Sequence, residues 1–379
     1  MTTLSELLRS SQIAARQAKQ NIALGARGRF LSDAHFAIGR HHELEGRYNN
    51  ALRHFEKALA AHPLSKEDAR NVRWLRRAMG RFDWEGIDPL EHLYMRLDLP
   101  VWDGRKVGTL FVSFFWGLGE EILAASMFDE LAQYADELIV ECSSRLLPIF
   151  ERSFPNITFA ARPGGMPWEP VVCGYSGPAD AHASLWVLMQ HLRPSMASFK
   201  PRAFLTPAAP KLAPTHQRTI GISWRSKEDH SGLRSMSPLD FAPLFSGMRG
   251  SRFIDLQYGS TQAARQAVED AFGVRLLAPV DAENDLDGLF SVIASCDAVI
   301  TAANSTQHFA GALGVPTWGL MPKLPGLAGW NWFLGRDDSP WYPNMRLVRP
   351  KWDSEWSEVV AVAADELRAA QRYTERKAA

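Results

Sequence analysis

The pattern of apolar and polar positions changes once along the chain, close to residue 105. Before this point, apolar residues recur with the three- to four-residue spacing of amphipathic helices. After it, short continuous apolar runs alternate with amphipathic segments, as strands alternate with helices in a doubly wound α/β domain. The sequence therefore predicts an α-helical segment followed by domains built on parallel sheets.

The helical segment contains one recognisable repeat. Residues 4–24 predict a first helix, and residues 35–63, HFAIGRHHELEGRYNNALRHFEKALAAHP, predict a pair of helices. Small and aromatic residues in this pair stand at the spacing of a tetratricopeptide repeat: Ile38, Gly39, Gly46, Tyr48, Ala51, Phe55, Ala58 and Pro63. A second Gly-Arg-aromatic triplet, 80–82, begins 34 residues after the first, 46–48. Because one repeat cannot bury its own faces, we expect the segment to pack on its neighbours; an unrelated helical hairpin is the alternative.

Two series of strand and helix patterns follow. In the first, the predicted strands are 106–114, 137–142 and 157–161. A proline-rich stretch, 200–217, is typical of an interdomain linker. In the second series the predicted strands are 219–224, 252–258, 274–279, 297–302 and 316–322. The predicted domains are a helical segment over 1–100, a first Rossmann-like domain over 101–205 and a second over 206–379, whose last helix, 354–375, is free to cross back to the first.

Composition excludes some classes of protein. The chain has 42 Lys+Arg and 42 Asp+Glu, so its formal net charge is zero, which argues against a nucleic-acid-binding face. No apolar run approaches the length of a membrane span, and the first residues lack the apolar core of a secretory signal. We therefore expect a cytoplasmic protein without a membrane span. Its three cysteines, Cys142, Cys173 and Cys296, form no closed disulfide framework and are expected to be buried.

Polar residues gather where the strand predicted over 297–302 ends. Asn304, Ser305, Thr306 and His308 stand at the start of the next predicted helix. The first turn of a helix has unpaired N–H groups and the positive end of the helix dipole, so a nucleotide phosphate fits there. The same residues also suit a plain helix cap, and His308 also suits helix packing. The pattern alone leaves these alternatives open.

Longer stretches of the chain resemble a known family. NSTQHFAGALGVPTWGL (304–320) and the tryptophan-rich WNWFLGRDDSPWYPNMRLVRP (330–350) resemble motifs of bacterial glycosyltransferases of the GT-B fold. These are the heptosyltransferase-like families and the tetratricopeptide-bearing glycosyltransferases related to flagellin-modifying enzymes. GISWRS (221–226), IDLQYG (254–259) and WGLGEEI (116–122) resemble further segments of the same enzymes. The resemblance implies two Rossmann-like domains that face a cleft, preceded by the helical segment.

The resemblance also implies that a nucleotide-sugar donor binds to the second domain. The residues it assigns to the donor are Ser223, Trp224, Arg225, Arg234, Gln257, Tyr258, Asn304, Ser305, Thr306 and His308. Arg234 takes the position of a basic residue over the donor phosphates, where a guanidinium binds phosphate oxygens bidentately. Arg225 and Lys227 are alternatives for this role. The family often has Asp where this chain has Ala303, so recognition of the donor sugar is expected to differ.

The general base is expected on the first domain, across the cleft from the donor. Glu120 follows a glycine loop and stands where the family has an acidic residue, usually Asp. A carboxylate in the first turn of a helix is also expected on structural grounds alone. The adjacent Glu121 is the alternative base. Further candidates on the acceptor side are Gly117, Gly119, Asp180 and His182.

The sequence thus predicts a GT-B glycosyltransferase that moves a sugar from a nucleotide sugar to a hydroxyl. No cofactor or essential metal is expected: Asp285 and Asp287 resemble the metal-binding Asp-x-Asp of another glycosyltransferase fold, but they precede a helix, where acidic residues cap. The acceptor is expected to be protein Ser/Thr, such as flagellin, or a saccharide, and the helical repeat favours a protein. The alternatives are a non-catalytic tetratricopeptide and sugar-binding scaffold and a nucleotide-sugar epimerase of the GT-B fold.

Overall fold

The computed structural model of the chain describes residues 4–82, 98–114, 117–162, 174–227, 229, 232–324, 327, 329–351 and 353–378. Its internal contacts divide the chain into two units. The first unit consists of Met1–Asp83 and Lys323–Gly335, and the second of Trp84–Pro322 and Arg336–Ala379. Cys173 and Trp116, which belong to the sequence predictions, lie outside the described residues.

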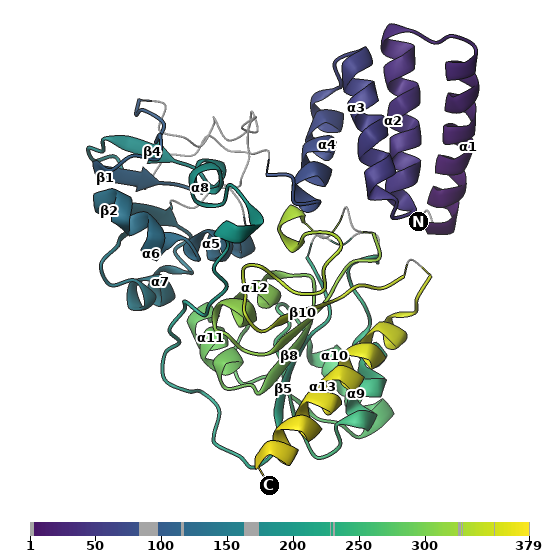
Figure 1. Ribbon diagram of the computed structural model, residues 1–379. Helices are drawn as coiled ribbons and strands as arrows, with labels where there is room; N and C mark the ends of the chain where they lie inside the picture. Colours follow the sequence, from purple (N-terminus) through teal and green to yellow (C-terminus); the bar gives the residue numbers. More distant parts are fainter. Residues whose placement is uncertain are drawn as a thin grey trace. The chain divides into compact units, whose positions relative to one another are not determined.

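The first unit is built from four helices that pack in chain order (Figure 1). They are α1 (Leu4–Ala23), α2 (Gly28–Leu44), α3 (Tyr48–Ala61) and α4 (Lys66–Ala78). Gly39 explains the close packing of α2 on α3, since a Cβ atom there would lie 2.6 Å from the Phe55 ring. Gly46, with a φ of +73°, makes the turn between the two helices. The predicted helices are therefore confirmed.

A distant part of the chain completes the core of this unit. The segment Lys323–Gly335, which includes the short helix η6 (Trp330–Trp332), belongs to it by its contacts. The N–H of Leu334 donates to the carbonyl oxygen of Ala78 (2.5 Å), and the ring centroids of Phe333 and Phe82 lie 6.1 Å apart. The Leu334 side chain packs against the buried residues of α3 and α4. The tryptophan-rich stretch thus supplies one of the neighbours that the helical segment was expected to need.

The second unit contains two parallel sheets. The first has the strand order β3-β2-β1-β4, and Val112 pairs with both Val140 and Ala183. Its strands are β1 (Val107–Val112), β2 (Ala135–Cys142), β3 (Thr158–Ala161) and β4 (Ala181–Ala183). Its helices are α5 (Leu118–Ala125), α6 (Phe128–Leu131), η2 (Ala132–Tyr134), α7 (Leu147–Ser153), α8 (Leu185–Leu192) and η3 (Met196–Ser198). The periodicity did not predict β4, because three residues are too few to show an alternation.

The second sheet has six parallel strands in the order β10-β9-β8-β5-β6-β7. The strands are β5 (Thr219–Ser223), β6 (Arg252–Asp255), β7 (Leu276–Leu277), β8 (Ala298–Ala302), β9 (Thr317–Leu320) and β10 (Met345–Val348). The helices are η4 (Pro238–Phe241), α9 (Ala242–Gly247), α10 (Gln262–Phe272), α11 (Leu286–Ala294), α12 (Ser305–Ala312) and α13 (Trp356–Ala378). Helices cover both faces of this sheet (Figure 1). The predicted fold class, two doubly wound α/β sheets after a helical segment, is confirmed.

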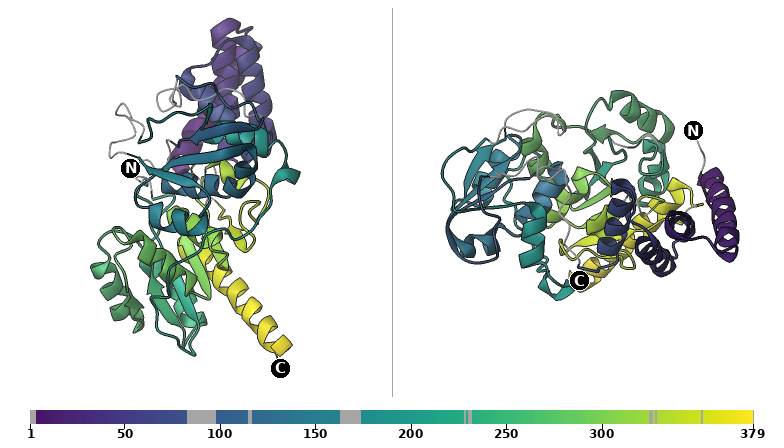
Figure 2. Two further views of the ribbon diagram at one scale, coloured as in Figure 1. Left: turned by 90° about the vertical axis from the view of Figure 1, so that its left-hand side faces the viewer. Right: turned by 90° about the horizontal axis from the view of Figure 1, so that it is seen from above.

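The last helix settles a point that the sequence left open. Instead of crossing back to the first sheet, α13 packs against α9, η4, β9 and β10 of the second domain (Figure 2). Its apolar residues enter the same core as the central strands: Val359, Val360, Ala363, Ala364 and Leu367. Glu366 on this helix accepts hydrogen bonds from the indole N–H of Trp318 (2.9 Å) and from the Arg346 guanidinium (3.0 Å). The helix therefore closes the face of the second sheet.

Two further expectations concern burial and membranes. Cys142 and Cys296 are buried free thiols, as predicted. Among the described residues, no helix combines the length and the apolar character that crossing a membrane requires.

Candidate functional site

The predicted site residues cluster at the positions where the strand order of each sheet reverses. In the second sheet the chain runs outward from β5 through β6 and β7, then returns to β8 beside β5. In the first sheet the same reversal lies between β1 and β4. Ligands of doubly wound sheets bind beyond the carboxyl ends of the strands at such switch points. Ser223 ends β5, Asn304 follows β8, and Glu120 follows β1.

Asn304 joins the start of α12 to the loop that follows β5. Its side-chain oxygen accepts from the N–H of Thr306 (2.9 Å), so it is the N-cap of the helix. Its amide nitrogen donates to the hydroxyl of Ser223 (2.7 Å) and to the carbonyl oxygen of Arg225 (3.0 Å). Asn304 and Ser305 remain partly exposed, whereas Thr306 is buried. The cap alternative is thus correct for Asn304, which in addition fixes the neighbouring loop.

Gln257 fixes the same loop from the other side. Its side-chain oxygen accepts three hydrogen bonds, from the Ser223 hydroxyl (3.0 Å), the Trp224 N–H (3.0 Å) and the Arg225 N–H (2.8 Å). Gln257 is buried, and Trp224 is part of the apolar core of the domain. Gln257 therefore holds the β5 loop in shape through hydrogen bonds, and Trp224 holds it through packing in the core. Tyr258, next in the chain, is only partly buried.

Arg234 has the unused hydrogen-bonding capacity expected of a phosphate-binding group. Its backbone N–H donates to the Asp229 carboxylate (2.9 Å), which fixes its position in the loop. One side-chain nitrogen, Nη2, donates to the carbonyl oxygen of Ala303 (3.3 Å). Its Nε is buried without a hydrogen-bond partner in the described part of the chain. Buried donors in folded proteins are nearly always paired, so this one is suited to a ligand. The alternative residues, Arg225 and Lys227, are exposed.

Glu120 lies in the first turn of α5, and its carboxylate is within electrostatic reach of Arg234 from the other sheet. Burial raises the pKa of Glu120 above its ordinary value. The backbone N–H groups of Glu120 and Gly117 and the charge of Arg234 oppose this rise in pKa. The net direction is upward, and a raised pKa makes a carboxylate a better proton acceptor.

Glu121 has different surroundings, although it is adjacent in sequence. Its carboxylate accepts from the backbone N–H of Ser143 (2.8 Å) and forms an ion pair with Arg162, and it is almost fully buried. Burial raises the pKa of Glu121 to about 7, against the opposing effects of Arg162 and the Ser143 N–H. This side chain therefore points into its own domain and ties α5 to the end of β2.

Helices α5 and α12 pack directly against each other. Gly119 permits this contact, because a Cβ atom there would lie 2.9 Å from the ring of His308. His308 is buried, and its Nδ1 lies 2.8 Å from the hydroxyl oxygen of Tyr342. Burial lowers the pKa of His308 to about 3, so the imidazole is neutral at physiological pH. Gly119 thus allows the close packing of α5 on α12.

Tyr342 is a site residue that the sequence did not single out. Its side chain is fully buried, and burial together with the charge of Glu120 raises its pKa. It therefore lies close to both His308 and Glu120. The only sequence signal was its place within the tryptophan-rich motif, where it stands in SPWYPN.

The structure places Asp180 and His182 at different parts of the first sheet. Asp180 accepts from the N–H of Thr109 (2.7 Å), near the beginning of β1 and ahead of β4. It therefore lies at the amino-terminal edge of the sheet, opposite α5. His182 is fully buried within β4, and its Nε2 lies 3.0 Å from the Ser113 hydroxyl.

The acidic residues at the start of α11 have structural roles. The Asp285 side chain accepts from the N–H of Gly288 (2.8 Å) and thus caps the helix, as expected. Asp287 forms an ion pair with Arg152 of the first α/β domain. Within the described ranges, no group of three or more His, Cys, Asp or Glu side chains is arranged to hold a metal ion.

Comparisons with known proteins give the following similarities. No protein-family model matches the chain. Protein FlbA of Caulobacter vibrioides is 27% identical over 365 residues, which cover 85% of this chain and 59% of that protein. The chain therefore spans 59% of the length of this curated relative.

The solved structures to which this chain is similar include glycosyltransferases. One is a glycosyl transferase family 9 protein from Veillonella parvula (12% identity, 65% of this chain, 86% of that chain, TM-score 0.45). Another is the ADP-heptose LPS heptosyltransferase II of E. coli (14% identity, 71% of this chain, 100% of that chain, TM-score 0.45).

Proposed function

We propose that this protein is a GT-B glycosyltransferase that transfers a sugar from a nucleotide sugar to a hydroxyl group, without an essential metal. One observation carries the proposal: Glu120 and Arg234 stand beyond the switch points of two different sheets, and α5, which bears Glu120, packs directly on α12 of the second sheet. Transfer of a sugar needs both groups, a base for the incoming hydroxyl and a cation for the departing phosphate. The sequence motifs that surround both residues point to the same chemistry.

In the proposed reaction, Glu120 accepts the proton of the acceptor hydroxyl while the acceptor oxygen bonds to the anomeric carbon of the donor sugar. The bond between that carbon and the nucleotide phosphate oxygen breaks, and the electron pair stays on the phosphate. Arg234 offsets the charge that develops there. The raised pKa of Glu120 suits a group that must take up a proton in the transition state.

Hydrogen bonds within the protein hold the proposed donor loop in shape. Asn304 and Gln257 together make hydrogen bonds to Ser223, Trp224 and Arg225. A site that is organised in advance loses less free energy on binding and can aim its dipoles at developing charge. In this proposal Ser305 and Arg234 contact the donor, and Asn304 and Gln257 position the loop.

The acceptor is proposed to be a protein Ser/Thr hydroxyl, with a saccharide as the alternative. The separate helical unit supports a protein, because stacked helices of this kind offer an extended surface to a polypeptide. The proposed setting is the cytoplasm.

The proposal is tested by turnover of nucleotide sugars by the purified protein. Binding is first screened by thermal shift with ADP-, CMP-, GDP- and UDP-sugars. A ligand that binds only the folded state stabilises it by about 2.7 kcal/mol at a hundredfold excess over Kd. Release of the nucleotide is then measured with peptide and saccharide acceptors. Release that requires an acceptor supports transfer, binding without any turnover supports a scaffold, and a changed sugar without an acceptor supports an epimerase.

A further inference from the structure

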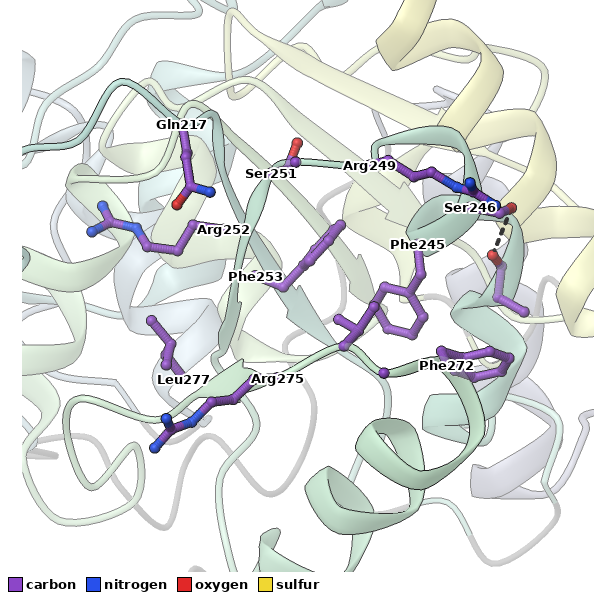
Figure 3. A pocket seen from close by; sticks show the side chains of 14 residues that line it. Gln217, Phe245, Ser246, Arg249, Ser251, Arg252, Phe253, Phe272, Arg275 and Leu277 are labelled. Carbon is purple, nitrogen blue, oxygen red and sulfur yellow. Dashed lines mark hydrogen bonds between the residues drawn. The ribbon is translucent and has the colours of Figure 1, made fainter.

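A second candidate site lies at the other end of the second sheet. A cavity of about 630 Å³ is lined there by residues that include Gln217, Arg249, Arg252, Phe272 and Arg275 (Figure 3). Its volume falls within the range of roughly 300–1,000 Å³ that is usual for small-molecule sites. It is called the arginine cavity below.

The arginine cavity is separate from the residues assigned to the donor. Gln217 and Arg252 stand at the beginnings of β5 and β6, whereas Ser223 and Gln257 stand at or beyond the ends of the same strands. A strand of five residues spans about 16 Å at a rise of ~3.3 Å per residue. A ligand in the cavity would therefore bind at the amino-terminal edge, and the proposed donor at the carboxyl edge.

The lining of the cavity is positively charged. It contains three arginines and no acidic residue. Arg252 is held in place, since its Nε donates to the Thr219 hydroxyl (3.1 Å) and its Nη1 to the carbonyl oxygen of Ala213 (2.9 Å). The other two, Arg249 and Arg275, are exposed, and neither has an ion pair with another described residue. Within the described part of the chain, no carboxylate is paired with either of these two guanidinium groups.

Aromatic rings form the apolar part of the cavity. Phe245 and Phe253 are buried, and their ring centroids lie 5.1 Å apart. Phe272 lies 5.6 Å from Phe245 by the same measure, and 39% of it is exposed. Figure 3 shows Phe253 and Phe245 between Arg249 on one side and Arg252 and Arg275 on the other, with Phe272 beyond Phe245. A flat apolar group could pack on Phe272 with an anionic group near a guanidinium.

We propose that the arginine cavity binds a small organic anion that carries an aromatic ring, of the class of aromatic carboxylates. A guanidinium pairs with a carboxylate through two parallel hydrogen bonds, and an aromatic ligand gains offset or edge contacts with phenylalanine rings. The three arginines repel cations. A neutral analogue of the ligand cannot form an ion pair with them. This inference does not depend on the proposed glycosyltransferase activity.

The test uses 2-naphthoate as the probe and 2-naphthamide as its neutral counterpart. Each is titrated into the full-length protein by calorimetry at low and at high salt. We expect saturable binding of one naphthoate per chain, weaker at high salt because exposed charges are screened. We expect naphthamide to bind roughly ten- to a hundredfold more weakly, because it lacks the charge-assisted hydrogen bonds.

Variants locate the binding site. Arg275→Ala and Phe272→Ala change exposed residues, so both proteins should fold, and each should weaken binding of naphthoate about tenfold or more. Arg105→Ala, at an arginine whose side chain is 86% exposed in the first α/β domain, is the matched control and should change nothing. Absence of saturable binding, equal affinity for naphthamide, or unchanged affinity in Arg275→Ala and Phe272→Ala would each overturn the proposal. Loss of naphthoate binding in Arg234→Ala would also overturn the proposal, because it would show that naphthoate binds at the other edge of the sheet.

Discussion

The two parallel sheets of this protein bring very different surroundings to their switch points. Beyond the second sheet, Asn304 and Gln257 form a connected set of hydrogen bonds around the β5 loop. Beyond the first sheet, Glu120 lies in the first turn of α5, while its neighbour Glu121 is turned inward to Ser143 and Arg162. The loop of the second sheet is thus held by several hydrogen bonds, and the proposed base stands beyond the first sheet.

This difference suggests a division of labour between binding and chemistry. In this proposal, several weak contacts together bind the donor, so the loss of one contact should weaken donor binding by a limited factor. A general base acts alone, so its loss should remove most of the rate. Substitutions in the two sheets should therefore have effects of different size and on different measurements.

The largest effect is expected for Glu120→Gln. The amide keeps the shape of the side chain but cannot accept the proton, so sugar transfer should fall by about 10²–10⁴-fold. Nucleotide binding, measured by calorimetry, should stay close to that of the unchanged protein. The matched variant is Glu121→Gln, which should lower the melting temperature because it disturbs a buried ion pair. Near-normal transfer by Glu120→Gln would show that another residue is the general base. The proposed difference between the two sheets would then be wrong.

A smaller effect is expected for Arg234→Ala in the second sheet. Loss of a charge-assisted hydrogen bond to phosphate should weaken nucleotide binding roughly ten- to a hundredfold. Lys227→Ala, in the same loop and exposed, serves as the control and should change the Kd little. A larger loss in Lys227→Ala or Arg225→Ala would transfer the phosphate-binding role to that residue.

Gln257→Ala tests the rigidity of the second sheet's loop. Three donors would lose their acceptor, two of them backbone N–H groups. The free energy of unfolding, from urea titration, should fall by about 1–3 kcal/mol. Gln266→Ala, on the exposed face of α10, is the control and should cost much less. An unchanged stability in Gln257→Ala would show that the loop does not depend on this side chain.

The smallest effect is expected for a substitution of His308, measured as the pH dependence of the free energy of unfolding. Its pKa is about 3 in the folded protein, against the ordinary histidine value of 6.5, so the unfolded chain binds more protons between these values. Stability should therefore fall as the pH is lowered through this window, by about 1.4 kcal/mol per pH unit below 6.5. His308→Gln should reduce the slope measured between pH 7 and about 5.5, and the remaining slope comes in part from His35, His41, His42 and His54, whose pKa values burial also lowers. An equal slope in His308→Gln would assign the acid sensitivity to other groups.

Local sequence patterns determined most of the secondary structure and part of the site. Apolar runs such as TLFV and AVIT could be recognised as buried strands, and amphipathic stretches as helices, because these signals depend only on residues near in the chain. The polar cluster after β8 and the acidic residue after the glycine loop were recognised for the same reason. The cap at Asn304 follows from side-chain chemistry and position alone.

Only the tertiary structure decided what those residues contact. The docking of 323–335 on the helical unit, the packing of α13 on the second sheet and the contact between Gly119 and His308 join residues far apart in sequence. Tyr342 has no local signal that would place it beside His308 and Glu120. Likewise, neighbouring Glu120 and Glu121 look alike in sequence, yet the rotation of about 100° between successive helix residues directs them to different surroundings. Residue spacing along the chain specifies which face a side chain occupies, but the partner on that face is set by the packing of distant elements.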